Sequence, residues 1–281
     1  MTYTTLITPK NLYQHLNDCN WIIIDCRFSL ANVETGFTSY RHNHIPNARY
    51  FHLDRDLSSR VTDFTGRHPL PNFAELVRKL GASGIDNNSQ VVIYDDASGA
   101  FAGRLWWLLR CLGHYNVAVL DGGLNHWQKL GFPLTTTLPA IKPTVFRAYP
   151  GENIGLSALE VQNSLAQKTI CLIDARTPGR YRGEQEPIDP VAGHIPGAVN
   201  RPFQQNLDSE GLFLSAEALR NQFKTLIGSK SPNQVVHMCG SGVTACHNLL
   251  AMELAGLTGS KLYPGSWSEW IRNKNRPIAL G

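Results

Sequence analysis

One pattern occurs twice in this chain, in the same order and with nearly the same spacing. Each of four segments in the first half has a counterpart 143 to 150 residues further on. A duplication that keeps both order and spacing predicts two copies of one fold, and a length of 281 residues leaves room for two domains of ordinary size. The paired segments are WIIIDCR (21–27) with ICLIDAR (170–176), HIPNA (44–48) with HIPGA (194–198), QVVIYDD (90–96) with QVVHMCG (234–240), and DGGLNHW (121–127) with PGSWSEW (264–270).

The two copies are joined by a stretch of different composition. Residues 133–155 are rich in proline, threonine and glycine and show little helical periodicity, which is typical of a linker. We therefore predict a first domain over residues 1–135, a linker over 136–155 and a second domain over 156–281.

Short apolar runs alternate with amphipathic runs in each half. WIIID, QVVIYD and VAVLDG are rich in β-branched residues and almost continuously apolar, as in strands of a sheet that is covered on both faces. NFAELVRKLGA and GRLWWLLRCLG have helical spacing and contain glycine at or near their ends. The alternation predicts an α/β fold in which each domain is a parallel sheet flanked by helices.

The strand-like run that ends at Met238 is followed by Cys239 and then by small residues. Ligands of parallel α/β sheets bind beyond the carboxyl ends of the strands, where Cys239 is expected; the first copy has Asp95 at this position. A tight loop leading into a helix turns backbone N–H groups inward, and these groups stabilise an anion and favour a reactive thiolate. Cys239 is therefore the predicted nucleophile. The loop residues predicted to surround a bound substrate are Gly240, Gly242, Val243 and Thr244.

Two other functions of a cysteine in such a loop do not fit the spacing of the residues around Cys239. Cysteine-dependent phosphatases need an arginine six positions after the nucleophile to hold the phosphoryl oxygens, and this chain has Ala245 there. A metal site would have to use Cys239 and Cys246 with His237 and His247, and their spacing matches no common zinc pattern. We predict neither a metal nor a cofactor.

The composition and the sequence patterns limit the binding partners and the cellular compartment that we expect. The formal net charge of +4 favours small anionic substrates, while the absence of basic runs with interleaved aromatic residues argues against nucleic acid. The N-terminus has no signal-peptide core, and the apolar run LWWLLRCLG is too short for a membrane span and carries Arg110. The six cysteines form no Cys-x-x-Cys pair, so we expect reduced thiols and a cytoplasmic protein.

Taken together, CGSGVTAC, HIPGA and GSWSEW resemble the signatures of two-domain sulfurtransferases of the rhodanese family, over about Thr8 to Ile278. The loop resembles the mercaptopyruvate branch, because the thiosulfate branch has basic residues where this chain has Gly240 and Ser241. The resemblance implies two tandem rhodanese-like domains, an inactive N-terminal copy and a catalytic C-terminal copy.

The implied reaction moves a sulfane sulfur from a small anionic donor, with 3-mercaptopyruvate favoured, through a persulfide on Cys239. The implied acceptor is a thiol, a thioredoxin-like protein or cyanide. Two alternatives stay open: thiosulfate as the donor, or a persulfide carrier or regulatory module without turnover of a small molecule.

The resemblance also assigns roles to single residues. It implies that Arg180 binds the substrate and that Ser241 and His44 relay a proton. The acidic member of that relay has no clear equivalent. A second substrate arginine of the mercaptopyruvate branch has no match either, since Ile188 or Asp189 stands in its place.

Overall fold

The computed structural model describes residues 2–149, 151 and 155–281, and the chain divides into two compact units. Unit 1 comprises residues 1–59, 70–152 and 210–212, and unit 2 comprises residues 60–69, 153–209 and 213–281. Ten residues of the first repeat, Arg60–Pro69, thus belong to unit 2. Residues 136–149 of the predicted linker belong to unit 1, while residues 150 and 152–154 lie outside the described part of the chain.

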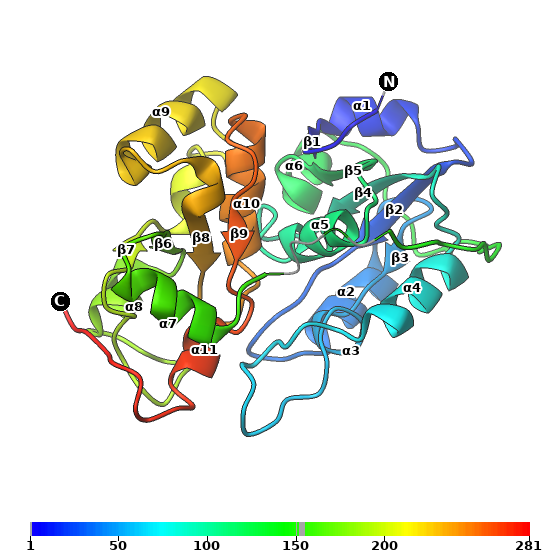
Figure 1. The fold of residues 1–281 in the computed structure, drawn as a ribbon. Coiled ribbons are helices and arrows are strands. Elements are labelled where there is room, and N and C mark those ends of the chain that lie inside the picture. Colours follow the sequence, from blue (N-terminus) through cyan, green and yellow to red (C-terminus); the bar gives the residue numbers. More distant parts are fainter. Residues whose placement is uncertain (1, 150, 152–154) are drawn as a thin grey trace. The chain divides into compact units, whose positions relative to one another are not determined.

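Unit 1 contains a five-stranded sheet in which every pairing is parallel, flanked by helices as predicted (Figure 1). In sheet order, the strands are β1 (Leu6–Ile7), β5 (Val117–Leu120), β4 (Gln90–Tyr94), β2 (Trp21–Asp25) and β3 (Arg49–Tyr50). Its helices are α1 (Pro9–Gln14), α2 (Thr35–His42), α3 (Leu53–Asp56), α4 (Phe73–Ala82), α5 (Ala102–Cys111) and α6 (Gly123–Lys129).

Unit 2 repeats this plan with a four-stranded sheet, again parallel throughout. In sheet order, the strands are β7 (Val199–Asn200), β6 (Cys171–Asp174), β8 (Val235–Met238) and β9 (Lys261–Leu262). Its helices are α7 (Ala158–Ala166), α8 (Pro178–Arg182), α9 (Ala216–Ile227), α10 (Ala245–Leu254) and α11 (Ser266–Trp270), with 3₁₀ turns η1 (Phe203–Asn206) and η2 (Pro232–Gln234).

The central strands are almost continuously apolar because both of their faces are covered. Every residue of β2, β4, β5 and β8 is buried, which accounts for their nearly continuous apolar sequences. The helix α10 is also buried along most of its length, from Ala245 to Met252. Its sequence accordingly shows no polar face, and its packing fixes the start of the helix directly behind the Cys239 loop.

None of the helices in the described residues is long and apolar enough to span a bilayer.

Candidate active site in unit 2

Cys239 leaves β8 at its carboxyl end, as the sequence predicts, and its side chain is buried. Its backbone N–H donates to Ser266 Oγ at 3.1 Å, and the N–H of Gly242 donates to Cys239 Sγ at 3.1 Å. Gly242 has a φ of +75°, and a β-carbon there would collide with the carbonyl oxygen of Pro264. Only glycine fits this turn, and the turn aims an amide at the sulfur.

The rest of the loop is held at both of its ends. The carbonyl groups of Cys239 and Gly240 accept hydrogen bonds from the backbone of Trp267 and Ser268, at 3.0 and 2.9 Å. At the other end, Val243 and Thr244 lead into α10, and Thr244 is its N-cap. The sulfur therefore lies in a rigid turn near the positive end of a ten-residue helix, a setting that favours negative charge.

Ser241 is paired with a histidine that the sequence analysis did not select. Ser241 Oγ and His68 Nδ1 are 2.7 Å apart, and both side chains are buried. His68 belongs to the segment Arg60–Pro69, which is part of unit 2. The two residues form a hydrogen-bonded pair beside the cysteine loop.

His44 has a different setting from the one expected of it. Its Nδ1 lies 2.7 Å from the carbonyl oxygen of Tyr40, and its Nε2 lies 3.1 Å from that of Thr137, both within unit 1. Its ring stacks on Tyr40, just as His194 stacks on Tyr181 in the other repeat. The histidine bonded to Ser241 is thus His68, while Nδ1 of His44 meets the carbonyl oxygen of Tyr40 as Nδ1 of His194 meets that of Tyr181.

Two arginines are joined by one carboxylate in unit 2. Arg180, on α8, donates through Nη2 to Asp189 Oδ2 at 3.0 Å and also pairs with Glu186. The other oxygen of Asp189 accepts a hydrogen bond from Nη1 of Arg67. Burial opposes ionisation of Glu186, but hydrogen bonds from Arg180 and from backbone amides outweigh it and lower the pKa of this carboxyl. The ionised acids hold both guanidinium groups in fixed positions.

This arginine pair faces the cysteine loop. A β-carbon placed on Gly240 would lie 2.8 Å from Nη2 of Arg67 and 3.5 Å from both terminal nitrogens of Arg180. Arg67 is further anchored through its backbone N–H, which donates to Ser268 Oγ at 3.0 Å. Its Nε is buried and has no hydrogen-bond partner among the described residues. Two cationic groups therefore lie within reach of the residue next to Cys239.

The sequence offered a weak sign of Arg67 and His68. The connection between α3 and α4, residues 57–72, is longer than its counterpart between η1 and α9, residues 207–215. The extra residues include the segment that joins unit 2 and have no twin in the second repeat. A search for what differs between the copies, instead of for what they share, would have drawn attention to them.

The residues considered for a metal do not form a metal site. His237 is fully buried, with Nε2 3.1 Å from Met252 Sδ, and burial lowers its pKa to about 3. Cys246 Sγ is directed to the carbonyl oxygen of Gly242 at 3.4 Å. Within the described ranges, no three histidine, cysteine or acidic side chains are grouped as a metal ion requires.

In unit 1, Asp95 occupies the position equivalent to Cys239. Its carboxylate accepts four backbone N–H bonds of 2.8–2.9 Å, from Ala97, Gly99, Phe101 and Ala102. The anion cradle of this repeat is thus filled by the protein's own carboxylate, and the loop offers no thiol.

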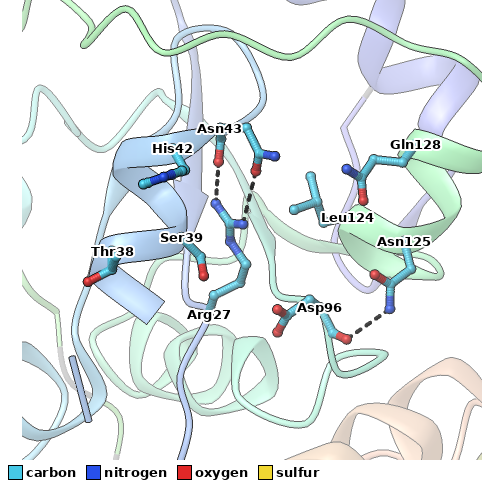
Figure 2. Close-up of a pocket in the computed structure, with 9 residues that line it drawn as sticks. All are labelled: Arg27, Thr38, Ser39, His42, Asn43, Asp96, Leu124, Asn125 and Gln128. Atoms are coloured by element: carbon cyan, nitrogen blue, oxygen red, sulfur yellow. Dashed lines mark hydrogen bonds between the residues drawn. The ribbon is translucent and has the colours of Figure 1, made fainter. Parts of the chain in front are cut away.

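A cavity of about 390 Å³ lies beside this loop in unit 1 (Figure 2). Asn43 accepts both hydrogen bonds that Figure 2 draws from Arg27, and Asp25 forms an ion pair with the same guanidinium. Asp96 and Asn125 meet across the cavity's floor. The loop beside this cavity has Asp95 where unit 2 has the Cys239 thiol.

Comparisons with known proteins show the family of the chain. The rhodanese-like domain family matches residues 8–130 and 157–273. The probable 3-mercaptopyruvate sulfurtransferase of Pseudomonas aeruginosa is 47% identical over 283 residues, covering 100% of both chains. The putative thiosulfate sulfurtransferase SseB of Mycobacterium tuberculosis is 38% identical over 264 residues, covering 92% of this chain and 90% of the relative.

Solved structures give the same picture. The 3-mercaptopyruvate sulfurtransferase from Leishmania major superposes with a TM-score of 0.82 at 30% identity, over 95% of this chain and 74% of that one. SseA from Escherichia coli superposes with a TM-score of 0.78 at 30% identity, over 95% and 100% of the two chains. Two rhodanese domains, with a cysteine loop in the second, define the class as two-domain sulfurtransferases. The chain belongs to the rhodanese family and is a sulfurtransferase of this class.

Proposed function

We propose that this enzyme takes the thiol sulfur of 3-mercaptopyruvate onto Cys239, where it becomes the sulfane sulfur of a persulfide, and passes it to a thiol. The observation that carries the proposal is the placement of Arg67 and Arg180 against Gly240, next to a sulfur that accepts the Gly242 amide. A small donor with a carboxylate at one end and sulfur at the other matches these two features.

The chemistry takes place in two half-reactions. The Cys239 thiolate attacks the donor sulfur, so that an S–S bond forms while the C–S bond breaks. The electron pair of the C–S bond goes to the pyruvate enolate, which takes up a proton at carbon. An acceptor thiolate then attacks the outer sulfur of the persulfide and regenerates Cys239. The Gly242 amide and the amino-terminal end of α10 stabilise the anionic sulfur throughout.

His68 and Ser241 supply the proton path. Their 2.7 Å contact couples an imidazole, which can accept and donate a proton, to a hydroxyl two residues from the nucleophile. In this proposal the pair removes the donor's thiol proton and returns a proton to the enolate. The role expected of His44 therefore passes to His68.

Arg67 supplies the second substrate arginine that the sequence lacks at Ile188 and Asp189. Asp189 acts as a positioning residue, because its two oxygens hold Arg67 and Arg180 side by side. Two acids, Glu186 and Asp189, offset the charge of the two arginines. A site with this balance suits a monoanion such as mercaptopyruvate better than thiosulfate, whose second charge would need a further cation on leaving water.

Thiosulfate remains the alternative donor, and SseB of Mycobacterium tuberculosis is named for that activity. We propose a cellular thiol or a thioredoxin-like protein as the acceptor, with cyanide as a substitute in assays. A nucleophilic thiolate needs a reducing compartment, and we propose the cytoplasm.

A donor comparison tests the proposal. Wild-type enzyme is given 3-mercaptopyruvate or thiosulfate with a thiol acceptor, and pyruvate or sulfite is measured. We expect a higher kcat/KM for mercaptopyruvate and no turnover of either donor by Cys239→Ser. A preference for thiosulfate would contradict the donor assignment. Single sulfur loading without turnover of either donor would instead support the carrier alternative.

A further inference from the structure

Arg201 follows β7 directly and lines a cavity of about 680 Å³ in unit 2. Only 5% of the residue is exposed, yet it lines the cavity. The other walls are amides, a hydroxyl and two leucines. The lining residues are Arg201, Gln205, Leu207, Leu214, Asn221, Gln222 and Thr225.

Every partner of Arg201 in the described structure is neutral. Its Nη2 donates to Asn206 Oδ1 and Gln222 Oε1, both at 2.9 Å, and its guanidinium lies 4.2 Å from the ring centre of Phe223. Its Nε is buried without a hydrogen-bond partner among the described residues. Burial lowers the pKa of Arg201 to about 10, which leaves it charged at neutral pH. A buried cation without a counter-charge is costly.

In the first repeat, a carboxylate supplies the counter-charge to a cation at the equivalent place in the fold. Asp56, at the position equivalent to Asn206, pairs with Lys79 Nζ at 3.1 Å. That lysine also lies over the ring of Phe51, which occupies the position of Arg201. Both repeats thus pair a cation with an aromatic ring at this place in the fold. Unit 1 has Asp56 as the counter-charge to its cation, whereas unit 2 has Asn206 at that position.

We propose that the Arg201 cavity binds a compact oxyanion, a carboxylate or a phosphate group, which takes the place of the missing acid. The charge and unused donors of Arg201 would hold the anion, and the side chains of Asn221 and Thr225 would supply further hydrogen bonds. Leu207 and Leu214 form an apolar wall that excludes water from one side. The site is separate from the residues assigned to sulfur transfer and does not depend on the proposed donor.

The test is a calorimetric titration of the full chain with inorganic phosphate, and separately with acetate. Chloride at equal ionic strength is the control for general salt effects. All proteins carry Arg67→Met and Arg180→Met, so that anion binding beside Cys239 is not counted. We expect saturable binding of phosphate, acetate or both, and the two arms show which group the cavity prefers.

Arg201→Met in the same background should weaken that binding about ten- to hundredfold, since charge-assisted hydrogen bonds are lost. Lys224→Met removes an equal charge from an exposed position of the same helix, α9, and should leave the affinity unchanged. Unaltered affinity in Arg201→Met, or no heat beyond that of chloride in the parent protein, would overturn the proposal.

Gln222→Glu provides a second variant that keeps Arg201. It places a carboxylate at the atom that already accepts from Arg201 Nη2, as Asp56 does for Lys79. We expect this variant not to bind the anion. In the absence of added anion, its melting temperature should be higher than that of its parent. Anion binding as strong as in the parent would show that Arg201 is not the binding group.

Discussion

His68 and Ser241 are 173 positions apart in the chain, and their side chains meet at 2.7 Å within unit 2. The serine lies in the cysteine loop of the second repeat, and the histidine comes from a connection in the first. The cysteine loop of the second repeat therefore takes a side-chain partner from the first repeat.

Removing the nucleophile should abolish turnover without unfolding the chain. Cys239→Ser is expected to lose all sulfur transfer, because a hydroxyl cannot form the persulfide. Mass spectrometry of the donor-treated wild type should find one added sulfur, about 32 Da, on the peptide that contains Cys239. Cys19→Ser, at an exposed cysteine of unit 1, is the control and should keep full activity. Sulfur found on Cys246 would refute the assignment.

Breaking the His68–Ser241 pair should lower kcat about 10²- to 10⁴-fold, because a positioned proton carrier is lost. His68→Ala, Ser241→Ala and the double variant should lose similar amounts, since the two residues act as one unit. A double loss equal to the product of the single losses would mean that they act separately.

His44 provides the contrast to that pair. His44→Asn should lower the melting temperature, because its ring joins two backbone carbonyls in unit 1. The protein that remains folded should turn over at nearly the wild-type rate. A selective loss of kcat without loss of stability would restore the original assignment of His44 to the relay.

Arg67 should act on donor binding. Arg67→Met is expected to raise the KM for mercaptopyruvate about tenfold to a hundredfold with a smaller change in kcat, because one charge-assisted hydrogen bond contributes about 1.5–3 kcal/mol. Arg67→Lys should recover part of the loss, since lysine keeps the charge without the planar fork.

Arg272 is the matched control for Arg67, because it is exposed and donates to the carbonyl of Thr65 in the same segment. Arg272→Met should leave the KM unchanged. Equal effects of the two variants would show that Arg67 only holds the segment in place.

Asp95 should matter for stability. Asp95→Ala leaves four backbone amides without their acceptor and is expected to lower the free energy of unfolding by about 3 kcal/mol or more. Urea denaturation measures this loss. Asp95→Asn keeps one acceptor oxygen and should lose less. An unchanged midpoint in Asp95→Ala would mean that water satisfies these amides in the folded protein.

Acid should remove the contribution of Glu186. Its folded pKa lies below the ordinary value of 4.5, so its ionised form adds stability that is fully present above that pH. The contribution is lost as the pH falls through the folded pKa. The melting-temperature difference between wild type and Glu186→Gln should therefore shrink between about pH 5 and pH 3. Glu217→Gln, on α9, serves as the control. A melting-temperature difference that stays constant over this pH range would show that ionised Glu186 does not contribute this stability.

The sequence by itself determined the repeated α/β fold, because buried parallel strands and their helices leave local periodic patterns. It also placed Cys239 at the end of β8, since a strand, a glycine turn and a helix are contiguous in the chain, and the family resemblance of its motifs selected Arg180. Tertiary structure decided the partners of both residues. Arg67 and His68 lie in a connection without periodicity, and only long-range packing brings that connection into unit 2. His44 belongs to a motif that both repeats contain. Such a motif indicates residues that the fold requires in each copy. Arg67 and His68 instead join unit 2 from the first repeat, through contacts that no local pattern encodes.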